Sequence, residues 1–103
     1  MIMKKIQFQN RQYLIINLEI KKISSNDYLM ISPKNSKVFY CNTITMRIYS
    51  YLYNDAVTSI NDIKNKLQLE FQVDSLLEQK VIEDIENTIH YFKEHHVLKE
   101  INE

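Results

Sequence analysis

The side chains that most often bind metals or act as nucleophiles are few in this chain. Its three histidines are His90, His95 and His96, and its single cysteine is Cys41. Zinc sites on a helix favour two histidines four residues apart, whereas the spacings here are five, one and six. The histidine pattern therefore predicts no metal site, and we expect no cofactor.

No catalytic group stands out among the remaining polar residues. A reactive thiolate needs a basic neighbour, and no feature of the sequence supplies one for Cys41, so we interpret Cys41 as a small buried hydrophobic residue. An acidic run at Glu78, Glu83, Asp84 and Glu86 has no matched acid–base partner and is typical of a solvated helix face. We therefore expect a protein that is not an enzyme.

The composition excludes several other classes of function. The chain contains no glycine, and both phosphate-binding loops and dinucleotide-binding motifs depend on glycine. The 13 basic and 13 acidic residues balance, so no global attraction to nucleic acids or anionic membranes arises. We expect a partner that is neither a nucleic acid nor a membrane.

The length of 103 residues favours one domain, residues 1–103, and 45% hydrophobic residues are enough for a core. One cysteine rules out an internal disulfide. The polar N-terminus is unlike a secretory signal, and no apolar stretch approaches the roughly 20 residues of a membrane span. These features predict a soluble cytoplasmic protein, and they leave its oligomeric state open.

Hydrophobic patterning in the first forty residues predicts β-strands. Residues 12–20, QYLIINLEI, are rich in β-branched and aromatic side chains and indicate one strand. Residues 28–32 and 37–41 indicate two more, joined by a turn around Pro33 that includes Lys34 and Asn35. Residues 1–11 alternate only in part and are either an extra strand or a flexible tail.

After Asn42 the hydrophobic period becomes helical, and the pattern predicts three helices. Asn42 is the expected N-cap of the first helix, which should end near Asn54 and Asp55. Thr58 or Ser59 should cap the second. The apolar stripes of these two helices are Ile44, Ile48, Tyr51 and Leu52, then Ile60, Ile63 and Leu67.

The third predicted helix is the longest. Asp74 or Ser75 should cap it, with Glu78 completing a capping box on Ser75. His95 and His96 would occupy its last turn, where positive charge is favourable. Its stripe is Leu77, Val81, Ile85, Ile89 and Phe92, followed by an apolar tail of Val97, Leu98 and Ile101 that should pack onto the core.

The order of these elements predicts an α+β fold. We expect an N-terminal three-stranded antiparallel sheet followed by three helices, an arrangement similar to a winged helix-turn-helix with its β part first.

Residues 28–52 also resemble the signature of the PqqD-like proteins, or RiPP recognition elements. That signature is an apolar strand, a turn, a second strand ending in an apolar-Asn pair, and a helix beginning with a small or hydroxyl residue. The matching segments here are Leu29-Met30-Ile31, Val38-Phe39-Tyr40-Cys41, Asn42 and Thr43. The second half matches at Ser59-Ile60-Asn61-Asp62-Ile63, Asp84-Ile85, Ile89, Phe92 and Val97-Leu98, so the resemblance covers roughly residues 12–101.

The resemblance implies a binding module for RiPP biosynthesis, the making of ribosomally synthesised modified peptides. Family members bind the leader region of a precursor peptide as an added strand on the third strand of the sheet, in a groove against the third helix. They present it to a modifying or processing enzyme of the same pathway. The peptide-binding residues implied here are Lys37, Val38, Phe39, Tyr40, Cys41, Val81, Ile82, Asp84, Ile85, Asn87, Thr88 and Tyr91.

The sequence leaves two alternatives open. A winged-helix DNA-binding regulator would place the third helix in the major groove, although residues 75–88 hold four acidic residues and one lysine. A small adaptor subunit that binds a folded protein would show a broad apolar patch instead of a narrow edge and groove.

Overall fold

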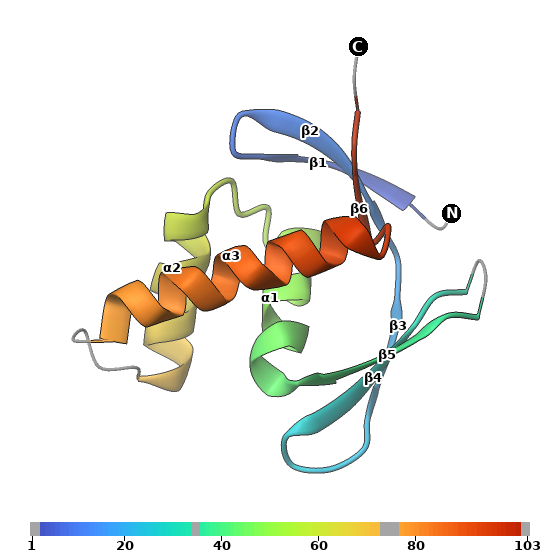
Figure 1. Ribbon diagram of the computed structural model, residues 1–103, viewed down its shortest axis with the longest axis horizontal. Helices are drawn as coiled ribbons and strands as arrows, with labels where there is room; N and C mark the ends of the chain where they lie inside the picture. Colours follow the sequence, from blue (N-terminus) through green and yellow to red (C-terminus); the bar gives the residue numbers. More distant parts are fainter. Residues whose placement is uncertain (1–2, 34–35, 73–76, 102–103) are drawn as a thin grey trace.

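The computed structural model describes residues 3–33, 36–72 and 77–101, and these residues form an α+β fold. Two three-stranded antiparallel sheets lie end to end, and three helices pack beside them (Figure 1). The α+β class is thus confirmed. The expectation of a single N-terminal sheet was incomplete, because a second sheet uses strands from both ends of the chain.

The unexpected sheet contains β1 (Met3–Phe8), β2 (Arg11–Ile16) and β6 (Leu98–Glu100), in the order β1-β2-β6. The hairpin turn between β1 and β2 is Gln9-Asn10, and both residues have positive φ, as a two-residue type I′ turn requires. Of the two alternatives for residues 1–11, the extra strand is therefore confirmed. The apolar tail packs onto the core as expected, and it does so as β6.

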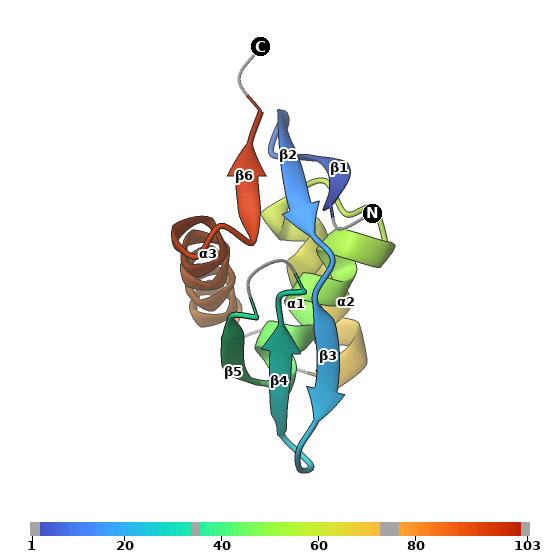
Figure 2. The same ribbon diagram turned by 90° about the vertical axis from the view of Figure 1, so that its right-hand side faces the viewer.

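The second sheet contains β3 (Glu19–Lys22), β4 (Asp27–Ile31) and β5 (Val38–Asn42), in that order. Figure 2 shows β2 running directly into β3, with β5 the strand of this sheet nearest α3. The single strand expected at 12–20 was wrong, because the chain changes sheet at Asn17 and Leu18. Lys34 and Asn35, expected in the turn before β5, lie outside the described residues.

A tyrosine from the first helix holds this change of sheet in place. The buried Tyr49 hydroxyl donates to the Ile16 carbonyl at 2.5 Å and accepts from the Leu18 N–H at 2.8 Å. Both backbone groups flank Asn17, so neither is left without a partner where the strand breaks. Burial raises the pKa of Tyr49 to about 12, which keeps the phenol protonated and able to donate.

The helices are α1 (Thr43–Asn54), α2 (Ile60–Phe71) and α3 (Glu78–Glu94). The two caps predicted for α1 and α2 are confirmed, because the Asn42 side chain accepts from Thr45 N–H and the Ser59 hydroxyl accepts from Asp62 N–H. The caps expected for α3, Asp74 and Ser75, lie outside the described residues.

The end of α3 differs from the expectation. The helix ends at Glu94, so His95 and His96 lie beyond it, and His96 has a φ of 60°. Val97 N–H donates to the Phe92 carbonyl and His96 N–H to the Lys93 carbonyl, which is the Schellman pattern. That left-handed residue turns the chain from α3 into β6.

The core lies between the sheets and the helices. The predicted stripes supply much of it, although Leu77 is 54% exposed and does not belong. Its largest fully buried side chains are Tyr13, Tyr51, Phe8, Phe92, Ile15, Met30, Ile48, Leu52, Ile63, Leu67, Ile85 and Leu98.

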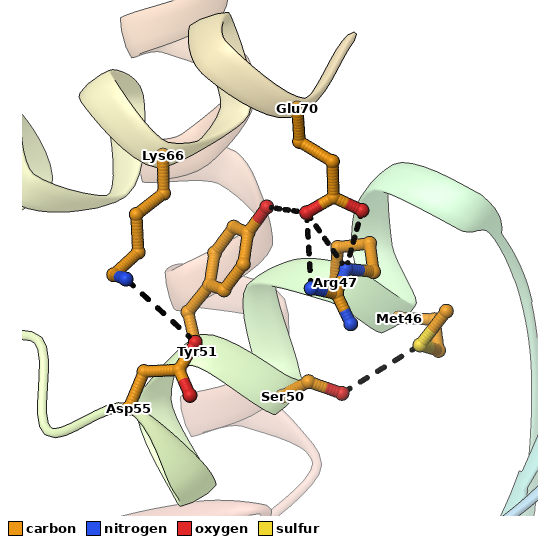
Figure 3. Close-up of polar contacts among 7 residues, drawn as sticks. All are labelled: Met46, Arg47, Ser50, Tyr51, Asp55, Lys66 and Glu70. Atoms are coloured by element: carbon orange, nitrogen blue, oxygen red, sulfur yellow. Dashed lines mark hydrogen bonds and ion pairs between the residues drawn. The ribbon is translucent and has the colours of Figure 1, made fainter.

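A polar cluster joins α1 to α2 (Figure 3). The Glu70 carboxylate accepts hydrogen bonds from the Tyr51 hydroxyl and from Arg47, whose Nε lies 2.9 Å from Glu70 Oε2. Partial burial raises the pKa of Glu70, but these hydrogen bonds outweigh it and hold the pKa below its ordinary value. The cluster thus adds hydrogen bonds and an ion pair between the two consecutive helices.

Candidate functional site at the free edge of β5

The outer edge of β5 is unpaired among the described residues, because β5 pairs only with β4. In an antiparallel ladder, alternate residues point both backbone groups at the partner strand, and the residues between them point outward. The Ser32 N–H donates to the Lys37 carbonyl at 2.8 Å, and these residues continue the β4–β5 register. Lys37, Phe39 and Cys41 therefore direct their backbone groups toward β4.

It follows that Val38 and Tyr40 present their N–H and C=O groups at the free edge. The other hairpin of the sheet gives the same result independently. Ile23 N–H donates to the Asp27 carbonyl in the β3–β4 register, which directs the backbone of Leu29 toward β3 and that of Met30 toward β5. Met30 lies opposite Phe39, so both hairpins agree on which β5 groups face outward.

The inner face of β5 carries an aromatic cluster that reaches α3. The ring of the buried Phe39 makes edge contacts with Tyr91 at 6.2 Å and His95 at 5.5 Å between centroids. Lys37 Nζ lies 5.4 Å from the Phe39 ring centroid and 3.0 Å from His95 Nδ1. These contacts place one end of β5 beside the C-terminal end of α3.

Two hollows lie along the line between β5 and α3. The helix hollow, of about 170 Å³, is lined by Ile44, Leu67, Val81, Asp84 and Ile85, and its walls are largely apolar. The strand hollow, of about 50 Å³, lies at the other end, where Ser32, Lys37 and Phe39 meet His95 and His96. Phe39 lines the strand hollow, whose walls also include the apolar side chains of Ile16, Leu18 and Val97.

The outer face of the same sheet is also apolar. Tyr40 lies opposite Leu29 and Val38 opposite Ile31, so all four side chains share one face. Tyr40 is 77% exposed and Val38 is 49% exposed, while Leu29 and Ile31 are half-buried. Alternation along β5 thus separates an aromatic inner face from an exposed apolar outer face.

The structure brings most of the site residues predicted from the sequence to this region. Residues 37–41 form the edge strand or its start, and Val81, Asp84, Thr88 and Tyr91 recur at helical spacing along α3. Ile85 is fully buried, so it lies in the core beneath the helix hollow. By helical spacing, Ile82 points away from this stripe and Asn87 lies at its margin.

Several residues that line the two hollows were not predicted as site residues from the sequence. Ser32 and His95 line the strand hollow, and Ile44 and Leu67 line the helix hollow. Ile44 and Leu67 had been expected in apolar stripes, and His95 in a helix turn. No local signal in the sequence links these positions, because each hollow is formed by segments far apart along the chain.

The polar groups here do not form a metal or nucleophile site. Within residues 3–33, 36–72 and 77–101, no group of three or more His, Cys, Asp or Glu side chains is arranged to hold a metal ion. Burial raises the pKa of the half-buried Cys41 thiol to about 11, so it is a thiol and not a thiolate near neutral pH. The prediction of Cys41 as a small buried hydrophobic residue holds only in part, because the side chain packs against the core but is partly exposed.

None of the helices in the described part of the chain is both long and apolar enough to cross a membrane. Comparisons with protein-family models, with curated proteins and with solved structures found no match to this chain.

Proposed function

We propose that this protein binds an extended peptide segment as an added strand on the free edge of β5. The observation that carries the proposal is the outward direction of the Val38 and Tyr40 backbone groups. An unpaired edge of this kind is a template for another strand, and main-chain hydrogen bonds to it give affinity for an extended peptide.

The surroundings of the edge support a peptide as the occupant. An added strand would place alternate side chains on the inner face, toward Phe39, Tyr91 and the two hollows. Those side chains would supply specificity, because each hollow has a different chemistry. A hollow lined by Ile44, Val81 and Ile85 favours an apolar side chain.

The resemblance to PqqD-like proteins suggests which peptide this is. In such a module, the winged helix-turn-helix core would be β3-β4-β5 with α1, α2 and α3, and the peptide would be the leader of a ribosomally synthesised precursor. The protein would then deliver that precursor to a modifying or processing enzyme of the same pathway by raising its effective concentration there. This is a binding role, without catalysis by the chain itself.

A second candidate is an adaptor that docks a folded protein through the outer face of the same sheet. The exposed side chains of Val38 and Tyr40 favour it, because they continue an apolar surface with Leu29 and Ile31. The DNA-binding alternative gains no such support. The solvent-exposed side of α3 carries Glu83, Asp84 and Glu86, which would repel phosphates.

Two substitutions of Tyr40 distinguish peptide binding at the β5 edge from protein binding at the outer face of the sheet. We expect Tyr40→Pro to weaken peptide binding, because proline removes the outward N–H while remaining compatible with an edge strand. Tyr40→Ala keeps that N–H and removes only the outward side chain, so it should bind the peptide within a few-fold of the wild type.

The probe is a peptide selected from a display library of random linear sequences, then synthesised with a fluorophore for polarisation measurements. The expected loss for Tyr40→Pro is about 10-fold or more, the value of one main-chain hydrogen bond. Circular dichroism of each variant verifies its fold. Unchanged affinity in a folded Tyr40→Pro protein would rule out strand addition at this position, and equal losses in both variants would favour the outer-face adaptor.

A further inference from the structure

The helix α3 has a second flank, which faces the β1–β2 hairpin and not β5. Glu86, His90 and Lys93 recur at helical spacing on the side of α3 opposite Asp84 and Tyr91. With the hairpin and the start of α2, this flank borders a hollow of about 440 Å³, the hairpin cleft. Its volume lies in the range of small-molecule sites. Its lining residues are Phe8, Gln9, Arg11, Tyr13, Ile60, Glu86, Ile89, His90 and Lys93.

The floor of the hairpin cleft is apolar, with one polar group that the fold leaves available. Phe8 and Ile89 are buried, and Ile60 packs against the same core. Tyr13 is only 2% exposed, yet its hydroxyl has no hydrogen-bond partner within residues 3–33, 36–72 and 77–101. The hydroxyl of a buried tyrosine usually finds a partner. A ligand in the cleft could therefore supply the partner for Tyr13.

Two cations lie at the same end of the cleft as Tyr13. Lys93 Nζ is 5.2 Å from the Tyr13 ring centroid, and it forms no ion pair with any residue that the structure describes. Arg11 lies two positions from Tyr13 on β2, so the two side chains share one face of the sheet. Arg11 Nη1 is 3.1 Å from both carboxylate oxygens of Glu100, and this leaves the Nε and Nη2 donors without a described partner. This end therefore offers three kinds of donor.

The negative groups near the cleft decide which residue an anion would depend on. Glu86 also lines the cleft, but it is seven positions from Lys93, or about 10 Å along α3. Between them, His90 Nε2 is 2.8 Å from Glu94 Oε1. The C-terminal end of α3 carries the negative end of the helix dipole, which also opposes an anion. Binding of an anion thus depends on Lys93 and Arg11, and Glu86 should weaken it.

We propose that the hairpin cleft is a second binding site, for a small carboxylate with an apolar body. The carboxylate accepts hydrogen bonds at the end formed by Lys93, Arg11 and the Tyr13 hydroxyl, and the apolar body lies on Phe8 and Ile89. This inference does not rest on peptide binding at β5, because the cleft lies across α3 from that edge.

The test is an NMR titration of the isotope-labelled protein with two probes, hydrocinnamate and hexanoate. Each acid is compared with its neutral primary amide, which keeps the apolar body and lacks the charge. The Lys93→Gln variant removes the ammonium, and Tyr13→Phe removes only a hydroxyl that no described residue bonds. Glu86→Gln removes the opposing charge.

The control for net charge is Lys99→Gln. Lys99 is exposed and lies opposite Leu14, so it is on the other face of the β1-β2-β6 sheet from Tyr13. Its substitution removes one positive charge, as Lys93→Gln does, but leaves the cleft unchanged.

We expect both acids to bind in the millimolar range, which is usual for ligands of this size, and to shift the amide signals of residues 9–13 and 86–93. Each acid should bind about 10-fold more tightly than its amide, as for a charge-assisted hydrogen bond. That preference should fall to about 2-fold in Lys93→Gln and to an intermediate factor in Tyr13→Phe. Glu86→Gln should strengthen binding of the acids by about 2-fold, and Lys99→Gln should behave as the wild type.

Four results would overturn the site. Equal affinity for acid and amide would show that the charge is not recognised. A preference for the acid that survives in both Lys93→Gln and Tyr13→Phe would place the carboxylate elsewhere, as would shifts confined to residues 37–41. Failure of both acids to bind up to their solubility limit would refute the cleft as a carboxylate site. Peptide binding by Tyr40→Pro is measured separately, so this site and the proposed function can fail independently.

Discussion

At the scale of single residues, the polar side chains of this protein divide into those that the fold uses and those that it leaves available. The Tyr49 hydroxyl donates one hydrogen bond and accepts another, and the Glu70 carboxylate accepts hydrogen bonds from two side chains. In both cases the partners belong to a different part of the fold. Ser32 has no such partner among the described residues. That contrast separates Ser32 from the side chains whose hydrogen bonds stabilise the fold.

Glu70 gives a pH-dependent test of this division. Because its folded pKa lies below the ordinary value, its contribution to stability is full above the unfolded pKa of about 4.3 and is lost as the pH falls through the folded value. We expect Glu70→Gln to lower the free energy of unfolding by about 1 kcal/mol at pH 7, a value kept small because the side chain is 37% exposed.

The measurement is urea unfolding of the wild type and Glu70→Gln at several pH values. The difference between the two proteins should shrink as the pH falls below the unfolded pKa of about 4.3 and through the lower folded pKa, because the wild-type carboxyl becomes protonated. Contributions from other carboxylates, such as Asp62, are common to both proteins and cancel in the difference. A difference that stays constant with pH would refute an ionised Glu70 as the stabilising group.

At the scale of elements, the change of sheet between β2 and β3 depends on one hydroxyl. We expect Tyr49→Phe to lower the free energy of unfolding by about 2–3 kcal/mol, because it leaves the Ile16 carbonyl and the Leu18 N–H buried without this partner. The matched control is Tyr53→Phe. Tyr53 stacks on Tyr49 at 5.9 Å between centroids, and its hydroxyl makes no side-chain hydrogen bond within the described residues.

Denaturant unfolding of the two variants measures both effects. Tyr53→Phe should stay within about 0.5 kcal/mol of the wild type. If the two losses were equal, the Tyr49 hydroxyl would not be what holds the strand break.

The elements that the sequence predicted well are those whose causes are local. The caps at Asn42 and Ser59 and the stripes of α1 and α2 depend on residues a few positions apart. The break after Ile16 depends on Tyr49, 31 residues beyond Leu18, and β6 exists only because it pairs with β2. No hydrophobic pattern within residues 12–20 could have indicated the break after Ile16 or the pairing with β6.

The candidate site was predictable to a similar degree. The edge strand and part of the α3 stripe follow from local pattern, whereas the identity of the outward-facing groups depends on the register between β4 and β5. The absence of glycine also hid two turns. Ala56 follows α1 and His96 follows α3, and both adopt the positive φ that glycine usually supplies.

At the scale of the whole molecule, two sheets share one helical layer, and each has an edge strand on the side of α3: β6 in one sheet and β5 in the other (Figure 2). The sheet of β1, β2 and β6 is tied to α1 by contacts such as that from Lys4 Nζ to the Tyr53 carbonyl, at 2.6 Å. It thereby anchors both ends of the chain against the helices. The central proposal concerns the β3-β4-β5 sheet, whose strand β5 would present its unpaired edge to an extended peptide.

Amide hydrogen exchange, followed by NMR with and without a selected peptide, tests that claim most directly. In the free protein, Phe39 and Cys41 should be protected by β4, while Val38 and Tyr40 should exchange rapidly. Adding the peptide to saturation should slow the exchange of Val38 and Tyr40 by about 10-fold or more and change Phe39 and Cys41 little. Strand addition at β5 would be contradicted by saturation with peptide that leaves the exchange of Val38 and Tyr40 unchanged. Equal protection of all four amides in the free protein would contradict it too.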